Sequence, residues 1–529
     1  MKENWQEQLH SLLNCDLKEL YPLARSLNRK LEFYVGPTNS GKTYNAMQKL
    51  KSANSGLYLA PLRLLALEGY EDLKKENIDA SLITGEEQML NEDAAHVCST
   101  IEMIDYDLDV DVAVIDEIQM LDDIDRGWAW VNAIIGCPAK KVIMTGSVNA
   151  LEAIKKIATY LGEELEVVRH KRKTELKVNE KYTSLDNLQD GTALIAFSRA
   201  DVLKLRHRLK KNYTVSVIYG NLSPEVRRDE ARKFREKQSQ ILIATDAIAM
   251  GLNLPIKTIL FTTDTKFDGV SRRKITVNEI VQIAGRAGRY GHFEAGFLGA
   301  TRRDILKHIS EEFKQPIRTI KPPFRVKINA SQLEALASHI KTNSLTKVLK
   351  YFADNMYFSG PFIAANISSM ITASKIVDTR FNLKLADKYL LAQAPITTKS
   401  PIILQAYEAY IAAVVKQKVC NYKPSITLPK KVITQKDLLL VEDEVKKISL
   451  YLWLSYKLPE IFPDHDKAYI LRNTFNSFIE NSLKGKIIQV EDPRRGNFNR
   501  RDNNEKQFDR KLRPRRARSE FKPRRRKRD

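Results

Sequence analysis

The segment LEFYVGPTNSGKTYNAMQKLK, residues 31–51, decides the fold class of this 529-residue chain. Its first five residues are typical of a strand, and its last nine have the composition of a helix. Between them, GPTNSGKT fits the pattern Gly-x4-Gly-Lys-Thr, whose glycines let the backbone wrap a phosphate group. The loop amides and the helix N-terminus supply positive dipole to such an anion. We therefore expect a phosphate-binding loop formed by Gly36, Pro37, Thr38, Asn39, Ser40, Gly41, Lys42 and Thr43.

The last two residues of this loop carry the side chains with a chemical role. Lys42 is expected to contact the β- and γ-phosphates of a nucleotide, and the hydroxyl of Thr43 is expected to bind Mg²⁺. The alternative is a glycine-rich turn that precedes a helix by chance. Because strand, loop and helix occur in the required order, the phosphate-binding interpretation is favoured.

A pair of carboxylates ends a second apolar segment, VAVIDEIQ at 112–119. Asp116 is expected to hold Mg²⁺ directly or through water, and Glu117 to orient and deprotonate an attacking water. Seen alone, two acids after a strand are more often a solvated pair. Their position in the same α/β unit as Lys42 favours the catalytic interpretation.

Two arginines lie three residues apart in a third segment, QIAGRAGRYG at 282–291. Arg286 and Arg289 share one face of a helix or turn, from which their guanidinium groups could stabilise charge on a γ-phosphoryl group across a cleft. A basic segment that faces water is the alternative. The glycines between and after the arginines favour a close backbone approach instead.

The order of apolar and amphipathic segments predicts an α/β protein with doubly wound parallel sheets. Short apolar runs alternate with helical stretches from 31 to about 265, and a charged stretch near 170 marks a seam. Beyond about 318 helical spacing dominates. We therefore expect a short helical segment at 1–30, α/β domains at 31–168 and 169–318, a mostly α-helical C-terminal region at 319–490, and a disordered Arg-rich tail at 491–529.

The charge of the chain points to a polyanionic partner. The net charge is +22, and residues 493–529 alone carry 17 Lys and Arg against 5 Asp and Glu. Nucleic acid and an anionic membrane surface both fit this pattern. No apolar run of about 18 residues predicts a membrane span. The four cysteines show no paired spacing, which argues against a disulfide framework or a zinc site.

The first ten residues, MKENWQEQLH, lack a secretory apolar region and are poor in Arg and Ser. They therefore predict a cytoplasmic protein of the bacterial type. A mitochondrial protein that has been processed is the alternative.

An ordered series of motifs resembles that of superfamily 2 helicases. The series is GPTNSGKT, APLRLLALE (60–68), TGEE (84–87), STIEM (99–103), DEIQM (116–120), TGS (145–147), FSR (197–199), VIYGNLS (217–223), ATDAIAMGLNL (244–254) and QIAGRAGR (282–289). DEIQM has Gln119 where the DExH subgroup has His, and is similar to the RNA helicase subunit of the mitochondrial RNA degradosome and its bacterial relatives. The resemblance covers about 30–480 and includes RGWAWVNAIIG (126–136), QAPITTK (393–399) and LYLWLSYKLPEIFPD (450–464).

This resemblance implies two tandem RecA-like domains and an ATP-dependent RNA helicase that translocates 3′-to-5′ in RNA degradation or ribonucleoprotein remodelling. It implies ATP and Mg²⁺ as cofactors. Other nucleoside triphosphates are also expected, because the adenine-reading element of DEAD-box proteins is absent. The implied partners are RNA, single-stranded or with a 3′ overhang, and an exoribonuclease, with DNA as the alternative substrate. No membrane partner is implied.

The resemblance also assigns roles to residues at matching motif positions. The catalytic set is Lys42, Asp116, Glu117, Gln282, Arg286 and Arg289, with Thr43 and Asp116 on the metal. Gly251, Arg286 and Arg289 join the phosphate-binding loop around the nucleotide, and Thr145, Ser147 and Asp246 couple hydrolysis to domain movement. Contacts to the nucleic-acid backbone are assigned to Pro61, Arg63, Thr84, Gly85, Thr100, Ser198 and Thr245, which track a strand without reading its bases.

Two alternatives to an RNA helicase stay open. A DNA or RNA–DNA hybrid helicase would use the same backbone contacts. Recognition of the 2′-hydroxyl, which distinguishes RNA from DNA, cannot be identified from these sequence motifs. A non-catalytic RNA-binding scaffold would bind ATP only as a structural ligand. The scaffold is disfavoured because Lys42, Glu117, Arg286 and Arg289 are all present.

The Arg-rich tail gives a first testable prediction. Deleting residues 491–529 is expected to weaken RNA affinity and to flatten its dependence on salt, because fewer phosphate charges are neutralised. The rate of ATP hydrolysis without RNA should not change. Titrations of RNA at several salt concentrations test this. Equal affinity and equal slope before and after the deletion would favour a tail that only solubilises the chain.

Overall fold

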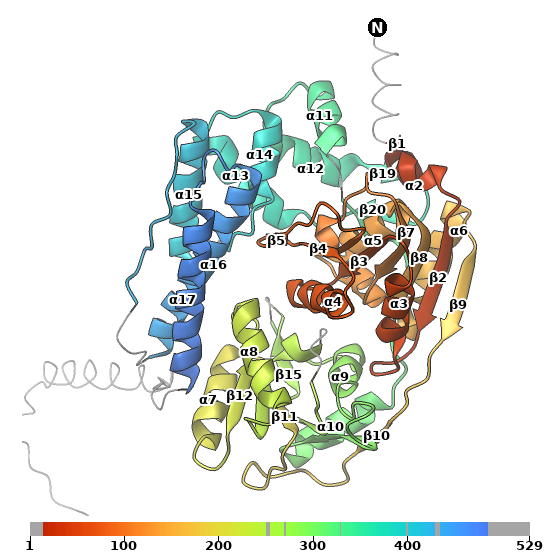
Figure 1. Ribbon diagram of the computed structural model, residues 1–529, viewed down its shortest axis with the longest axis vertical. Helices are drawn as coiled ribbons and strands as arrows, with labels where there is room; N and C mark the ends of the chain where they lie inside the picture. The colour runs from red at the N-terminus through yellow and green to blue at the C-terminus, as the bar shows by residue number, and fades with distance from the viewer. Residues whose placement is uncertain are drawn as a thin grey trace, which may run out of the picture.

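The computed structural model describes residues 14–249, 254–268, 271–327, 330–397, 400–428 and 434–484. The tail at 491–529 and Gly251 lie outside these residues. The described chain forms two α/β lobes that face each other and a helical region beside both of them (Figure 1). Within the described ranges, no helix combines the length and apolarity needed to cross a membrane.

The first lobe is built on an eight-stranded sheet in which all pairs are parallel except β4 with β5. Its central strands are buried along their length because helices cover both faces of the sheet. The strand order is β5 (Gln88–Met89), β4 (Ala80–Ile83), β6 (His96–Thr100), β3 (Gly56–Ala60), β7 (Val110–Ile115), β8 (Ala139–Gly146), β2 (Lys30–Val35) and β9 (Leu165–Arg169).

Successive side chains of these strands alternate between two apolar cores. Phe33 of β2 packs in one core with α5 (Gly127–Gly136) and α6 (Leu151–Leu161). Its neighbour Tyr34 packs in the other with α3 (Lys42–Lys51) and α4 (Arg63–Lys75). The lobe starts with β1 (Asn14–Cys15), η1 (Leu17–Leu20) and α2 (Pro22–Ser26), and the short helices η2 (Ile101–Met103), η3 (Ile118–Asp122) and η4 (Val148–Ala150) follow strand ends.

The second lobe has a six-stranded, fully parallel sheet. The strand order is β10 (Glu175–Val178), β17 (Ala295–Ala300), β14 (Thr258–Phe261), β11 (Thr192–Ile195), β13 (Ile241–Ala244) and β12 (Val215–Ile218). Its helical elements are α7 (Arg199–Leu209), α8 (Pro224–Arg235), η5 (Asp246–Ala249), α9 (Val277–Ala284) and α10 (Arg303–Phe313), and β15 (Thr265–Phe267) and β16 (Arg272–Lys274) form an antiparallel hairpin. Only residues 170–174 separate the last strand of the first sheet from the first strand of the second.

The helical region packs against both lobes. It consists of α11 (Ala330–His339), α12 (Leu345–Asn355), α13 (Ser368–Arg380), α14 (Leu385–Ala392), α15 (Pro401–Val415), α16 (Gln435–Lys457) and α17 (His465–Lys484). The parallel pair of β1 with β19 (Tyr357–Phe358) joins its start to the first lobe. The parallel pair of β18 (Phe324–Val326) with β20 (Phe362–Ala364) packs buried residues into the core of that lobe. Figure 1 shows α16 and α17 side by side along the two lobes. Apolar residues of α16 share one core with the second sheet.

A fully buried arginine ties the helical region to both lobes. Arg472 of α17 pairs through Nη1 with Glu86 of the first lobe (3.1 Å) and through Nη2 with Glu225 of the second lobe (3.0 Å). Its side chain is 0% exposed. The three regions of the molecule therefore meet at one guanidinium group.

Replacing Arg472 by Ala is expected to lower the free energy of unfolding by about 3–5 kcal/mol, because two carboxylates would lose their shared buried partner. Urea denaturation of the full chain measures this. Arg228→Ala is the matched control, since Arg228 also joins the lobes through Glu71 but is half-exposed; it should cost at most about 1 kcal/mol. Equal effects of the two variants would contradict the prediction.

Candidate active site between the two lobes

The phosphate-binding loop lies between β2 and α3, with Gly41 in the left-handed conformation (φ +83°) just before the helix. A Cβ at Gly36 would lie 2.4 Å from the carbonyl oxygen of His170, so only glycine fits there. Lys42 Nζ donates to the carbonyl oxygen of Pro37 at 2.8 Å, and burial lowers the pKa of Lys42. The buried hydroxyl of Ser40 has no hydrogen-bond partner. An anion in this loop would meet an ammonium group and an unsatisfied hydroxyl.

Asp116 lies just beyond β7 and is almost completely buried. Its Oδ1 accepts hydrogen bonds from the hydroxyls of Thr43 (3.0 Å) and Thr145, and its Oδ2 accepts one from Tyr58 (3.2 Å). Burial, together with the charge of Glu117, raises the pKa of Asp116. A carboxylate in this environment is stabilised by a nearby cation.

The oxygens of Thr43 and Asp116 are hard ligands of the kind that Mg²⁺ prefers. In the part of the chain that the structure describes, no three His, Cys, Asp or Glu side chains form a metal-binding group. Mg²⁺ commonly takes one or two protein oxygens and completes its shell with waters and phosphate oxygens. The two oxygens therefore fit a metal that arrives with a nucleotide.

Glu117 adopts a left-handed conformation (φ +55°), which is uncommon for a residue with a side chain and is typical of functional sites. Its Oε2 accepts a hydrogen bond from Gln119 Nε2, and Gln119 Oε1 in turn accepts from the amide of Ser147 at 3.1 Å. The motif residues of β7 and β8 are thus connected through Gln119. The motif resemblance identified Gln119 as a feature of the family but assigned no role to its side chain.

Arg286 of the second lobe reaches Glu117 of the first. The helix α9 begins with a capping box of Thr276 and Glu279 and ends just before the turn that carries Arg286. Arg286 Nη2 lies 3.4 Å from Glu117 Oε1, and its Nε donates to the carbonyl oxygen of Ala249 at 3.1 Å. A guanidinium group from one lobe and a carboxylate from the other therefore face the same gap.

The other two residues expected beside Arg286 have different surroundings. Arg289 is half-buried, and burial followed by the nearby charge of Arg235 lowers its pKa, while Glu68 of α4 raises it. Arg289 thus lies among charges of α4 and α8. Gln282 lies on α9, one turn before Arg286, and is partly buried.

The residues expected to contact nucleic acid follow the carboxyl ends of parallel strands in both sheets. Pro61, Thr84 and Thr100 come at or after the ends of β3, β4 and β6, and Ser198 and Thr245 come after β11 and β13. The carboxyl edges of doubly wound sheets are where ligands bind.

Several of these side chains already have partners within the protein. The Thr84 hydroxyl accepts a hydrogen bond from the amide of Glu87 (3.0 Å), and Ser198 caps α7 by accepting from the amide of Asp201. Arg63 forms an ion pair with Glu86, the residue that also pairs with Arg472.

The expected coupling residues and Gly85 make contacts of their own. Asp246 pairs with Lys266 of the β15–β16 hairpin at 2.5 Å, and Ser147 hydrogen-bonds the side chain of Asn149. A Cβ at Gly85 would lie 3.6 Å from Trp453 of α16, so the helical region borders this edge of the first lobe.

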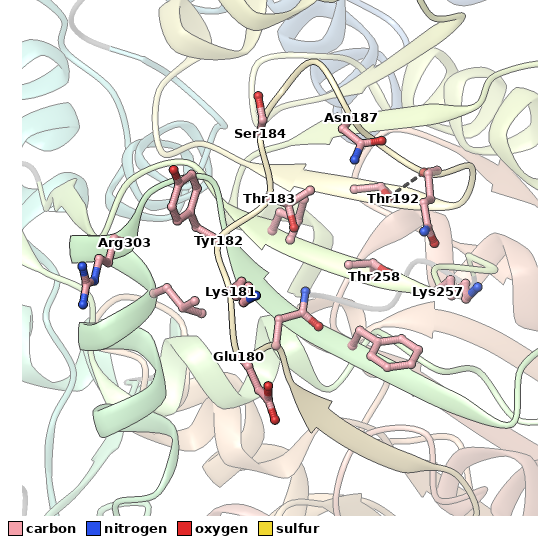
Figure 2. A pocket seen from close by; sticks show the side chains of 15 residues that line it. Glu180, Lys181, Tyr182, Thr183, Ser184, Asn187, Thr192, Lys257, Thr258 and Arg303 are labelled. Carbon is pink, nitrogen blue, oxygen red and sulfur yellow. Dashed lines mark hydrogen bonds between the residues drawn. The ribbon is translucent and has the colours of Figure 1, made fainter.

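Two hollows lie on the second lobe. One of about 1000 Å³ is lined by residues 179–184, by Thr192 and Thr258 at the amino ends of β11 and β14, and by Arg303 (Figure 2). It is therefore at the sheet edge opposite to Ser198 and Thr245. The other, of about 480 Å³, includes Ser198 and the basic side chains of Lys204, Arg208, Lys266 and Arg272.

Comparisons with known families match most of the chain. Residues 18–170 match the DEXQ-box helicase domain of Suv3, residues 176–291 match the helicase conserved C-terminal domain, and residues 438–485 match the ATP-dependent RNA helicase SUV3 C-terminal domain. The chain is 34% identical to the DExH-box ATP-dependent RNA helicase DExH16, mitochondrial, of Arabidopsis thaliana, over 88% of this chain and 82% of that protein. It is 32% identical to ATP-dependent RNA helicase SUPV3L1, mitochondrial, of Mus musculus (92% and 66%) and to ATP-dependent RNA helicase SUV3, mitochondrial, of Saccharomyces cerevisiae (86% and 65%). The chain thus spans about two thirds of the mouse and yeast proteins and more of the Arabidopsis protein.

Proposed function

Because this chain belongs to the Suv3 family of ATP-dependent RNA helicases, we propose that it hydrolyses ATP between its two α/β lobes and uses the resulting movement to translocate along RNA. The observation that carries the proposal is the contact of 3.4 Å between Glu117 and Arg286. Hydrolysis of a triphosphate needs a group that orients water and a positive charge that stabilises the transition state. These two groups come from different lobes, so closure of the lobes completes the site.

Each group has a distinct part in this reaction. Lys42 and the loop amides bind the phosphates, and Glu117 orients and deprotonates the attacking water. Gln119 holds the carboxylate of Glu117 in place. Thr43 and Asp116 hold Mg²⁺, which neutralises charge on the phosphate oxygens. ATP is the expected substrate, and other nucleoside triphosphates are accepted because their phosphates make the same contacts.

In this proposal the RNA strand runs along the carboxyl edges of the two sheets. Backbone contacts there fit a single strand or the 3′ overhang of a duplex, and the four basic side chains around Ser198 support a phosphate path. Translocation 3′-to-5′ and a role in RNA degradation or ribonucleoprotein remodelling follow the family, and so does an exoribonuclease as a partner. DNA remains a second candidate substrate, because such contacts do not read bases.

Stimulation of hydrolysis tests the proposal. The rate of ATP hydrolysis by the full chain is measured alone, with homopolymer RNA and with single-stranded DNA. Stimulation by RNA supports an RNA helicase, and stimulation by DNA alone supports the DNA alternative. If no condition gives turnover, the chain is an RNA-binding scaffold and the proposal is wrong.

The relatives correct the location expected from the sequence. The sequence predicted a cytoplasmic protein, but the Arabidopsis, mouse and yeast relatives are all named as mitochondrial. The cytoplasmic prediction is therefore wrong, and the mitochondrial alternative agrees with the family. The error came from inferring location from the composition of ten residues, which says nothing about the family to which the chain belongs.

A further inference from the structure

We propose that Arg172, in the segment between the two sheets, is a positioning residue for hydrolysis that fixes the turn carrying Arg286 against the phosphate-binding loop. This inference rests on the proposed function and adds a residue that no motif of the sequence indicated. Arg172 lies within residues 170–174, which join β9 to β10. It is therefore at the point where the two lobes are covalently connected.

The guanidinium group of Arg172 binds backbone carbonyls from both lobes at once. Nη1 donates to Gly285 (2.9 Å) and to Thr38 of the phosphate-binding loop (3.3 Å). Nη2 donates to Ala287, and Nε donates to Thr174 at 2.8 Å. All three nitrogens of the fork are used, and each acceptor is a main-chain oxygen. A planar fork with several fixed donors suits this task better than a single ammonium group.

The carbonyls that Arg172 holds in the second lobe flank Arg286 on both sides. Gly285 precedes Arg286 and Ala287 follows it, so the backbone on either side of the arginine is anchored. Asn39 adds to this by donating from Nδ2 to the carbonyl oxygen of Gly285 at 3.0 Å. The direction in which the Arg286 side chain leaves the turn is thus set by Arg172 and Asn39.

The turn at Gly285 also lies against the side chain of Thr38 in the phosphate-binding loop. A Cβ on Gly285 would lie 2.7 Å from Thr38 Cβ, which shows how closely the turn approaches the loop. Arg172 sits beside this contact and hydrogen-bonds to both of its sides. Burial lowers the pKa of Arg172, so the half-buried cation is held there by carbonyl dipoles at some energetic expense. Burying this cation costs free energy, which is consistent with a role for Arg172 in fixing the turn at Gly285 against the phosphate-binding loop.

The consequence is a selective effect on the chemical step. Arg286 acts on charge that develops in the transition state, and misplacing such a group by about 1 Å can lower the rate about 10²-fold. Binding of ATP in the ground state depends mainly on Lys42 and the loop amides. Loss of Arg172 should therefore lower kcat and leave KM for ATP nearly unchanged.

The test compares Arg172→Ala and Arg172→Lys with Lys171→Ala, an exposed residue of the same segment. kcat and KM for ATP are measured with the full chain at saturating RNA. We expect kcat to fall about 10- to 100-fold in Arg172→Ala and by a similar factor in Arg172→Lys, with KM changed less than about threefold. Lys171→Ala should behave as the wild type. The unfolding midpoint of each variant identifies any that does not fold, and Arg172→Lys then carries the test.

A double variant separates positioning from an independent role. Arg172→Ala combined with Arg286→Ala should be no slower than Arg286→Ala alone, because Arg172 acts through Arg286. Multiplied effects, or a folded Arg172→Ala protein with wild-type kcat, would overturn the inference while the wild type still shows RNA-stimulated hydrolysis. A wild type without any hydrolysis would instead contradict the proposed function, and this inference with it.

Discussion

Replacing Glu117 by Gln is expected to lower kcat for RNA-stimulated ATP hydrolysis about 10²- to 10⁴-fold, the range in which a positioned general base contributes. The amide keeps the shape of the side chain but cannot accept a proton from water. The left-handed backbone at Glu117 directs this side chain to the gap between the lobes, where it meets Arg286. ATP binding should persist, because the phosphate-binding loop is unchanged.

The measurement is kcat at saturating RNA, together with equilibrium binding of ATP. Asp122→Asn is a matched control, since Asp122 is an exposed acid that ends the short helix after Glu117. It should leave both quantities unchanged. A Glu117→Gln protein that binds ATP and hydrolyses it at the wild-type rate would show that another group activates the water.

Replacing Arg286 by Ala is expected to lower kcat about 10³- to 10⁵-fold, the contribution of an arginine that stabilises phosphoryl transfer from across a cleft. The side chain of Arg286 extends from the second lobe to the carboxylate of Glu117. Its removal takes away transition-state charge and also the ion pair with Glu117. KM for ATP should change much less than kcat.

Arg289 and Arg302 supply the comparison for this experiment. Arg289 lies near Glu68 and Arg235, so Arg289→Ala should lower kcat less than Arg286→Ala does. Arg302 is exposed and pairs with Asp304, so Arg302→Ala should have no effect. If Arg289→Ala gives the larger loss, the transition-state role belongs to Arg289, and the lobes must close further than they do in this structure.

Central strands such as β2 and β7 could be predicted from the sequence, and the edge strands β9 and β10 could not. LEFYV and VAVID are apolar along their length because helices bury both faces of those strands, and the structure has β2 and β7 there. The edge strands β9 and β10, in contrast, mix charged and apolar residues. These two strands carry charged residues because one side of each is open to solvent, so their sequences resemble loops. The predicted fold class, two parallel-sheet domains with a helical C-terminal region, is confirmed.

In the candidate site, residues within sequence motifs could be predicted, and residues positioned by tertiary packing could not. Residues that follow a strand in a glycine-rich or acidic motif, such as Lys42 and Glu117, could be placed in the candidate site from the sequence, because such motifs are local. Arg172 could not, because its partners are carbonyl oxygens, which every residue has. Its charged surroundings predicted only a domain seam. Arg472 was missed for a related reason: a fully buried arginine is rare, so a sequence pattern suggests an exposed one.

The short connection between the two sheets limits how far the two lobes can separate. Residues 170–174 are the whole chain between β9 and β10, so six Cα-to-Cα steps join Arg169 to Glu175. Fully extended, six steps span at most about 20–22 Å. The ends of these two strands cannot separate by more than this length, so the two lobes can rotate relative to each other only about the segment at 170–174. On the opposite side of the molecule, Arg472 of α17 pairs with Glu86 of the first lobe and Glu225 of the second, so separation of the lobes there would have to break one of these buried ion pairs.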